Sequence, residues 1–255
     1  MENKEEYIKD RLREIINIYN SVIDNIDDKS RAVSNHGQNS SGGFLRARKG
    51  QLCPTITKEL ILLAWESLGQ DKDSIHFNAK TIKYPIDLSY VHSIKSRKVQ
   101  QKIKDNLSKF QYRLPPDVLI YLEIDEAPIA YIECKAYTET AMLKRVLFDC
   151  SVAKKVHPDI TCFLFQLESQ LGGDYSALKK EVETVGSYPS RTLFSVVPEV
   201  DLKIFTFLEG DRQVNKAIHK KEFKKELTEE SLLRGLELLT EFLKKHIKED
   251  KSDEE

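Results

Sequence analysis

The sequence predicts an α/β (α+β) fold in which helices flank a central mixed β-sheet, with a helical region at the N-terminus. Two strand signals support this. Residues 115–137 read as a β-hairpin, and the apolar run ITCFLFQLE at 160–168 is typical of a buried central strand. Segments with helical periodicity precede and follow them. Because neither an internal repeat nor a clear linker interrupts the 255 residues, we expect one domain.

The composition is that of a globular chain and gives no general attraction to nucleic acid. Apolar residues make up 40% of the chain and charged residues 32%, and the formal net charge is −1. Nucleic-acid binding would therefore depend on clustered charge. The N-terminus MENKEEYIKD has no apolar signal segment, and no stretch approaches the roughly 18 apolar residues of a membrane span. We expect a cytoplasmic protein without membrane contact.

The cysteines and histidines show no metal-binding pattern. The four cysteines form no CxxC pair and fit neither a zinc motif nor a disulfide framework, so we expect small buried side chains in a reducing compartment. None of the six histidines has a metal-ligand spacing, and no glycine-rich loop matches a phosphate cradle. A zinc site and a nucleotide cofactor are therefore not expected.

Two helices are expected in the first 70 residues. Apolar residues recur at steps of three and four over 3–26, which predicts core packing, with dimerisation through this stripe as the alternative. A helix that is apolar nearly all round is expected over 54–69, with Pro54 in its first turn. Glu59 and Glu66 share one face of it, and a carboxylate on a buried helix needs a partner.

The segment between these helices, residues 34–51, is rich in Gly, Ser and Asn and then turns basic. One interpretation is a mobile surface loop. The alternative is an arm that orders on phosphates or reads base edges. The candidate DNA contacts in it are Asn35, His36, Gln38, Asn39, Arg46, Arg48 and Lys49.

A basic helix is expected over residues 92–113. Its only acidic residue is Asp105, against the cations Lys95, Arg97, Lys98, Lys102, Lys104 and Lys109. These charges are interpreted either as a solvated face or as a face that contacts phosphates.

Periodicity and β-propensity predict the remaining elements. Helices are expected over 139–156, 174–187 and 228–248, and further strands over 192–200 and 201–210. Residues 71–91 are ambiguous, with short strand-like runs. The acidic tail EDKSDEE is expected to be disordered.

The hairpin carries three charged residues where a core would not accept bare charges. With its turn centred near Glu126, residue i lies opposite roughly 252 minus i, so Asp117 is expected opposite Lys135. Side chains alternate between the faces of a strand, so Glu133 and Lys135 share a face with Asp117, while Cys134 points to the other. A slip of one residue in register would break this convergence.

Two neighbouring carboxylates repel each other, and a hard divalent cation removes that penalty. Such a cation takes oxygen ligands, including a backbone carbonyl such as that of Cys134. A lysine beside them balances the charge and can orient or help to deprotonate a water. The constellation suits metal-assisted phosphodiester hydrolysis.

These residues resemble the PD-(D/E)XK nuclease motif: Pro116-Asp117, a hairpin of suitable length, and then Glu133-Cys134-Lys135. The order of elements over residues 45–170 is similar to that of type II restriction endonucleases. The resemblance implies a restriction-endonuclease-like core and a magnesium-dependent enzyme that hydrolyses both strands of DNA at a short specific sequence, leaving 5′-phosphates. One or two Mg²⁺ per site, replaceable by Mn²⁺, and a homodimer on double-stranded DNA follow from the same resemblance.

The resemblance also implies roles for individual residues. Asp117 and Glu133 would be metal ligands, together with the carbonyl of Cys134, and Lys135 would act on the attacking water or stabilise the transition state. A helix before the motif often adds a glutamate, for which Glu59 is the first candidate and Glu66 the second. DNA contacts are also expected from the helix after the hairpin, through Lys144, Arg145, Lys154 and Lys155.

Within one nuclease domain spanning 1–255, we expect an N-terminal helix and loop arm (1–50), a catalytic core (51–210), a C-terminal helical part (211–248) and the tail (249–255). Two rival functions remain open at this point. One is a repair or junction-resolving nuclease with the same catalytic residues. The other is a non-catalytic DNA-binding module, for which Mg²⁺ or Ca²⁺ would change neither thermal stability nor DNA affinity.

Overall fold

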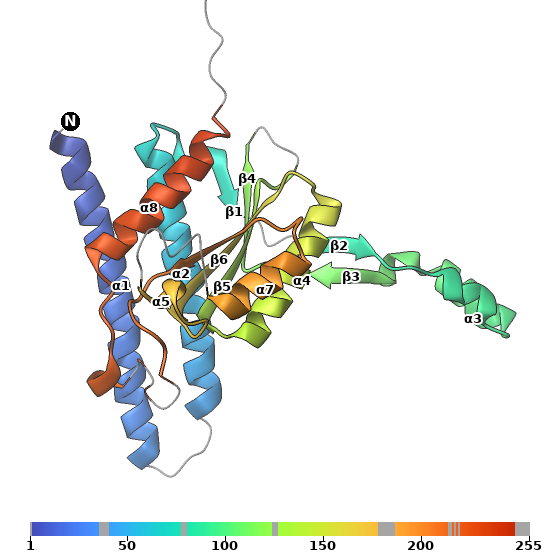
Figure 1. Ribbon diagram of the computed structural model, residues 1–255, viewed down its shortest axis with the longest axis horizontal. Helices are drawn as coiled ribbons and strands as arrows, with labels where there is room; N and C mark the ends of the chain where they lie inside the picture. Colours follow the sequence, from blue (N-terminus) through green and yellow to red (C-terminus); the bar gives the residue numbers. More distant parts are fainter. Residues whose placement is uncertain are drawn as a thin grey trace, which may run out of the picture.

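A computed structural model gives the fold (Figure 1). The structure describes residues 2–35, 41–77, 81–123, 127–177, 187–213, 216, 218 and 220–247. For residues 2–3, 26–35, 41–49, 174, 177 and 221 it describes the backbone alone. Of the helix expected over 174–187, residues 178–186 lie outside the described residues, as does the acidic tail.

Helices occupy both ends of the chain and alternate with strands between them. The α-helices are α1 (Glu2–Asn35), α2 (Ser41–Ser67), α3 (Arg97–Lys104), α4 (Thr140–Val156), α5 (Asp174–Ala177), α7 (Tyr188–Val196) and α8 (Glu229–Lys244). The strands are β1 (Ile75–Phe77), β2 (Ile82–Pro85), β3 (Gln111–Leu114), β4 (Val118–Leu122), β5 (Ala130–Thr138), β6 (Thr161–Ser169) and β7 (Leu202–Thr206). Short 3₁₀ turns lie at η1 (Lys72–Ser74), η2 (Ser89–Ser93), η3 (Leu107–Lys109) and η4 (Lys221–Phe223).

The sheet is mixed, as the sequence predicts. Its strand order is β1-β4-β5-β6-β7, in which β1, β4 and β5 pair antiparallel and β5, β6 and β7 pair parallel. The helix α4 makes the crossover between the parallel strands β5 and β6. Strands β2 and β3 form a separate two-stranded ribbon.

Helices cover both faces of this sheet (Figure 1). On one face α1, α2 and α8 bury a core that includes Phe163, Phe165, Phe205 and Phe207. These rings stack with centroids 5.1 to 6.0 Å apart, within the range of favourable aromatic contacts. On the other face α4 and α7 cover a second core around Tyr131, Leu164 and Cys150. The prediction of a mixed sheet between helices is therefore confirmed.

The expected loop at 34–51 is wrong for most of its length. Helix α1 continues to Asn35 and α2 already begins at Ser41, so that Pro54 lies inside α2 and not in its first turn. Helix propensity is a weak preference that tertiary packing overrides. Cys53 immediately before the proline and Ile56 after it are both fully buried, and this packing holds the helix together through Pro54.

Two further elements differ from the expectation. The expected strand at 192–200 is wrong: its residues 192–196 belong to the helix α7, and 197–200 form a turn. Its β-branched and aromatic residues suggested a strand, but Leu193 and Phe194 pack on the α4 side of the sheet. The expected helix over 92–113 is confined to α3, and its last residues belong to β3. The strand expected at 201–210 is confirmed as β7.

The cysteines behave as expected, since Cys53, Cys134, Cys150 and Cys162 are all free thiols and all buried. Within the described part of the chain, none of the helices has the length and apolar character that a membrane crossing requires.

Candidate active site

The hairpin register differs from the expectation by two residues. Strands β4 and β5 pair with Val118 opposite Ile132 and Ile120 opposite Ala130. Extending this register by one step places Asp117 level with Glu133 and not with Lys135, so the expected pairing is wrong. A shift of two residues restores the same strand face, because side chains alternate with a period of two. The three charged side chains therefore still converge.

Their contacts form one cluster. The Lys135 ammonium lies 3.0 Å from Asp117 Oδ2 and also forms an ion pair with Glu133 Oε2. The Tyr131 hydroxyl donates a hydrogen bond to Glu133 Oε1. Both oxygens of Glu133 are thus engaged by donors from its own strand.

Burial differs strongly between the two carboxylates. The Glu133 side chain is 9% exposed, whereas the Asp117 side chain is 35% exposed. Burial raises the pKa of Glu133 in spite of the Lys135 ammonium and the Tyr131 hydroxyl, which both favour its charged form. Burial opposes the charge of Lys135, but Glu133 and Asp117 outweigh it and raise the pKa of that ammonium. The site thus holds one buried and one accessible carboxylate around a lysine that stays charged.

The backbone of β5 is open to this cluster. Strand β4 begins at Val118, so its pairing with β5 ends at Ile132. The N–H group of Cys134 instead donates to Asp117 Oδ2 at 2.8 Å. In an extended strand the N–H and C=O groups of one residue point to the same side, so the Cys134 carbonyl also faces Asp117.

This donor set fits a hard divalent metal. Two carboxylates and a carbonyl offer the oxygen ligands that Mg²⁺ or Mn²⁺ prefers. The described residues contain no group of three or more His, Cys, Asp or Glu side chains that is able to hold a metal ion. A metal here would therefore be held by the two carboxylates and the backbone, with the Lys135 ammonium displaced from between them.

The side chain of Cys134 points away from the cluster, as expected. Its Sγ lies 3.7 Å from Thr57 Oγ1 of α2, on the opposite face of the sheet. Burial raises the pKa of this thiol well above its usual range, which suppresses the nucleophilic thiolate.

The structure does not bring the helix glutamates into the cluster. Glu59 Oε2 pairs with Arg11 of α1 at 2.9 Å, and Glu66 Oε2 accepts a hydrogen bond from Tyr7 of α1 at 3.2 Å. Because Thr57 faces the sheet, a residue two positions later points about 200° away around the helix. Both carboxylates therefore interact with polar side chains of α1 and not with the catalytic cluster.

The expected DNA contacts are spread over two regions. Lys144, Arg145 and Lys155 are exposed on α4 and Lys154 is half-buried there. Arg145 Nε lies 3.6 Å from Asp149, and the Lys155 ammonium lies 5.9 Å from the ring centre of Tyr84. Of the N-terminal candidates, Asn35 ends α1, while Arg46, Arg48 and Lys49 belong to α2 with only their backbone described. His36, Gln38 and Asn39 lie outside the described residues.

Sequence reasoning missed three polar residues on the same side of the sheet, two in strands and one in the helix α4. Tyr131 was visible in principle, because it precedes Glu133 by two positions on one strand. Gln166 lies opposite Lys135 in β6, where its Nε2 donates to Thr206 at 2.8 Å and its buried Oε1 has no hydrogen-bond partner among the described residues. Asp149 of α4 is buried and accepts from Tyr112 of β3 at 3.1 Å. Strand order and helix packing decide these two positions, and no local motif marks them.

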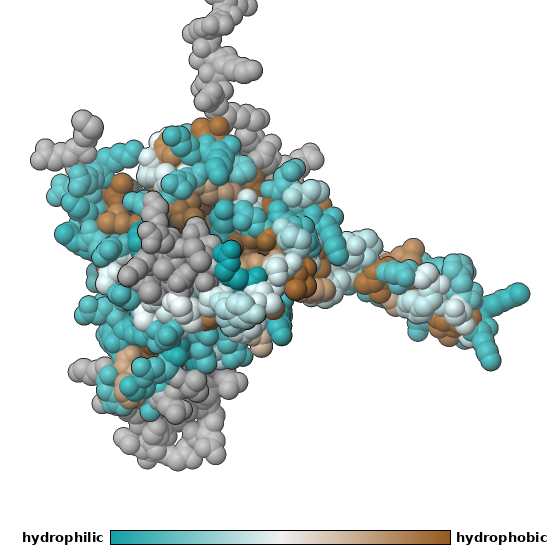
Figure 2. Space-filling view, in the orientation of Figure 1, coloured by the Kyte–Doolittle hydropathy of each residue, from teal (hydrophilic) through white to brown (hydrophobic). Residues whose placement is uncertain are grey.

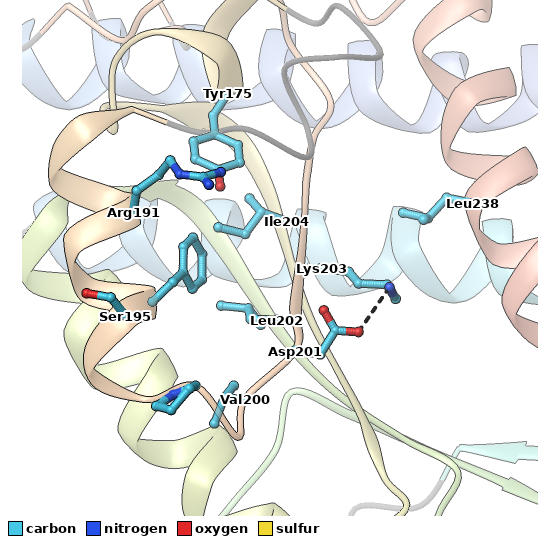
Figure 3. Close-up of a pocket in the computed structure, with 11 residues that line it drawn as sticks. Tyr175, Arg191, Ser195, Val200, Asp201, Leu202, Lys203, Ile204 and Leu238 are labelled. Carbon is cyan, nitrogen blue, oxygen red and sulfur yellow. Dashed lines mark ion pairs between the residues drawn. The ribbon is translucent and has the colours of Figure 1, made fainter.

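A separate hollow of about 630 Å³ lies at the other edge of the sheet, between α7, β7 and α8 (Figure 3). Tyr175, Phe194 and Ile204 contribute to its wall, and Asp201 and Lys203 pair beside it at 3.3 Å. It contains none of the residues expected to act on a substrate.

Comparison with known proteins places the chain in a family. No family model matches the sequence. The chain is 42% identical over 233 residues to the type II restriction enzyme DdeI of Desulfomicrobium norvegicum (strain DSM 1741 / NCIMB 8310), covering 91% of this chain and 95% of that enzyme. A solved structure described as the native BbvCI A2B2 tetramer at low resolution aligns over 97% of this chain and 93% of that chain, with 11% identity and a TM-score of 0.34. The identity to the restriction enzyme, over nearly the whole of both chains, shows that this chain belongs to the type II restriction enzymes, which are site-specific deoxyribonucleases.

Proposed function

We propose that this protein is a Mg²⁺-dependent endonuclease that hydrolyses double-stranded DNA at a short specific sequence and leaves 5′-phosphates. One observation carries the proposal. Asp117, Glu133 and Lys135 converge beside the uncovered edge of β5, within contact distance of one another. Type II restriction enzymes generally use a divalent metal, and carboxylate and carbonyl oxygens of this kind suit Mg²⁺.

Each residue has a distinct task in this proposal. Asp117, Glu133 and the Cys134 carbonyl would hold the metal, which when bound supplies Lewis-acid polarisation of the scissile phosphoryl group. The Tyr131 hydroxyl keeps Glu133 oriented, and Asp117 is fixed by the Cys134 N–H group. Water reaches the cluster from the side of Asp117, because Glu133 is almost fully buried.

Lys135 acts through its charge. In the metal-free protein its two carboxylate neighbours raise the pKa of its ammonium, so Nζ enters the reaction carrying its proton. A protonated lysine stabilises negative charge that develops on the phosphoryl oxygens, and it is a poor base for the attacking water. Of the two roles that the sequence leaves open for Lys135, the electrostatic one is therefore favoured.

We infer a homodimer from the requirement for two cuts. One chain provides one such cluster, and cutting both strands of a symmetric site needs two clusters related by a two-fold axis. The cations Lys144, Arg145, Lys154 and Lys155 on α4 and Arg46, Arg48 and Lys49 on α2 are the proposed contacts to DNA, together with Asn35, His36, Gln38 and Asn39 between the first two helices. Most are suited to phosphates and few to base edges.

Incubation of the purified protein with unmethylated phage DNA and Mg²⁺ tests the proposal. Sharp fragments from the wild type, none from Lys135→Ala, and sharp fragments from the exposed control Lys245→Ala are expected. Mapped fragment ends would give the recognition site and the terminal phosphate, and light scattering would give the oligomeric state. Cleavage of branched DNA alone would favour a structure-specific nuclease. Intact DNA with every divalent metal tried would contradict the catalytic assignment.

A further inference from the structure

Residues 82–114 form an extension that leaves the body of the molecule, and we call it the basic finger. Its base is the antiparallel ribbon of β2 and β3, paired from Ile82 with Leu114 to Pro85 with Gln111. Its tip consists of η2, α3 and η3. Figure 1 shows the finger projecting to one side of the sheet, with α3 at its far end. It adds no strand to the central sheet, and only its base, through Ile82 and Leu114, contributes to a hydrophobic core. The residues of η2, α3 and η3 belong to neither core, so the tip has no evident part in holding the fold together.

The charge of the finger is opposite to that of the remaining chain. It contains eight basic residues and two acidic ones, a net charge of +6, whereas the whole chain has −1. The basic residues are Lys83, Lys95, Arg97, Lys98, Lys102, Lys104, Lys109 and Arg113, and all are exposed. None of them forms an ion pair with any described residue, while Asp87 and Asp105 bond locally to Ser89 and Gln101.

Helix α3 concentrates the charge on one side. At 100° per residue, Arg97, Lys98, Lys102 and Lys104 occupy one half of its surface. The other half carries the exposed Val99 and the half-buried Ile103. Gln100 joins the helix to the end of η2 through a 2.7 Å hydrogen bond to the Ile94 carbonyl. Figure 2 shows hydrophilic and hydrophobic residues side by side on the finger. The helix thus presents a cationic surface beside a smaller apolar one that is itself partly exposed.

The finger is joined stiffly to the catalytic cluster. Strand β3 ends at Leu114, and only Pro115 and Pro116 separate it from Asp117. Proline fixes the backbone angle φ, so this connection has little freedom. The ribbon also contacts helix α4.

Tyr112 of β3 makes this contact with α4. Its hydroxyl donates to the buried Asp149 of α4 at 3.1 Å, and its ring packs edge-on to Phe148 at 5.8 Å. The base of the finger is therefore fixed relative to α4 and to Asp117.

We propose that the basic finger is a clamp that binds the phosphate backbone of duplex DNA beside the cleavage site, through Arg97, Lys98, Lys102 and Lys104. The proposal rests on the nuclease function and adds a sequence-independent contact to it. A surface of exposed cations that form no ion pair with described residues matches a polyanion, and the two-proline connection ties the base of the finger to the hairpin that carries Asp117. A second copy of the chain, whose body is acidic, is the competing occupant that the test separates.

The test measures binding of a short duplex without a recognition site, in EDTA, between about 50 and 200 mM salt. The variant Arg97→Gln/Lys98→Gln/Lys102→Gln/Lys104→Gln is compared with a charge-preserving variant, Arg97→Lys/Lys98→Arg/Lys102→Arg/Lys104→Arg. A third variant, Lys244→Gln/Lys245→Gln, removes two exposed cations at the end of α8. Circular dichroism confirms that each variant is folded, and Lys98→Gln/Lys102→Gln replaces the fourfold variant if that protein does not fold.

The fourfold Gln variant should bind DNA at least tenfold more weakly at low salt. The slope of log K against log salt should fall by about 0.9 for each phosphate that the variant no longer neutralises. The charge-preserving and α8 variants should retain the wild-type slope. An unchanged slope in the fourfold variant would overturn the clamp, as would a change of oligomeric state without a change in DNA affinity. Cleavage by the wild type in Mg²⁺ is scored separately, so failure of the clamp and failure of the nuclease function give different results.

Discussion

The backbone N–H group of Cys134 donates a 2.8 Å hydrogen bond to Asp117 Oδ2, across the point where β4 no longer covers β5. This bond replaces the sheet hydrogen bond that a longer β4 would have made. It fixes the accessible carboxylate of the cluster on the same side as the Cys134 carbonyl. Asp117 is therefore held in place before any metal binds.

Asp117→Asn should keep the fold and lose the metal. The amide oxygen of Asn still accepts the bond from Cys134, but the negative charge is gone. We expect Ca²⁺ or Mg²⁺ to raise the thermal midpoint of the wild type and to leave that of the variant unchanged, with cleavage abolished. Differential scanning calorimetry with and without metal measures this. A metal-dependent shift of wild-type size in the variant would remove Asp117 from the ligand set.

Tyr131→Phe should move the acidic limb of the pH–rate profile to higher pH. The hydroxyl of Tyr131 lowers the pKa of Glu133 by hydrogen bonding to its charged form, so removing it raises that pKa further. The ring is retained, and the loss of one hydrogen bond costs about 1 kcal/mol of stability. Rates of cleavage measured from acid to neutral pH should show the shift, and Tyr188→Phe, at an exposed position, should not. An unmoved acidic limb would mean that Glu133 does not titrate in the rate-determining state.

The metal-free protein should lose stability as pH rises through the pKa of Glu133. The folded-state pKa of Glu133 is raised above its ordinary value of 4.5, so the protonated form is favoured in the folded state. The contribution of Glu133 to the free energy of unfolding is fully present below its pKa in the unfolded chain. It is lost as pH rises through its pKa in the folded protein. Lys135 adds no pH dependence in this range, because its own raised pKa lies far above it.

Urea unfolding in EDTA over this pH range, for the wild type and Glu133→Gln, tests this linkage. The wild type should lose stability relative to the variant as pH rises. Added metal should reverse that loss. If the metal-free wild type instead gained stability relative to Glu133→Gln as pH rises, the folded-state pKa of Glu133 would be lowered.

Glu59→Gln should leave cleavage unchanged and lower stability modestly. Glu59 pairs with Arg11 on α1 and points away from the sheet, so its charge does not reach the cluster. Both side chains are about one-third exposed, which limits the expected loss to about 1 kcal/mol or less. Single-turnover cleavage and urea unfolding measure the two effects. A tenfold or larger fall in rate would restore the helix glutamate to the catalytic set.

Gly235→Ala should destabilise the protein even though alanine is the better helix former. A Cβ at this position of α8 would lie 3.0 Å from Cζ of Phe205, inside the aromatic core. Overpacking of this kind costs about 1 to 3 kcal/mol, more than the roughly 1 kcal/mol of helix propensity gained. Gly50→Ala on α2 is the matched control, since nothing lies within 4 Å of its added Cβ, and it should stabilise. Equal gains in both variants would show that Phe205 moves aside freely.

The candidate site was more predictable than the helices around it, for a physical reason. The strand period of two decided which face Asp117, Glu133 and Lys135 share, and an error of two residues in register left that face unchanged. Neither the register nor the neighbouring strand is encoded locally, so Gln166 and Asp149 could not be assigned to the site from the sequence. The α7 segment and the Gly- and Ser-rich start of α2 became helices because packing outweighs propensity where the two disagree.

Strand β4 begins only at Val118, and this also determines the order in which metal and DNA bind. Glu133 is closed off by the sheet and α4, so the gap beyond Val118 is the side from which an ion and a scissile phosphate would arrive. A duplex lying across that gap would cover the passage that the ion uses. We therefore expect the ion to enter before or together with DNA, and its exchange to stop while substrate is bound. Turnover at limiting metal would then depend on how often the enzyme is free of DNA.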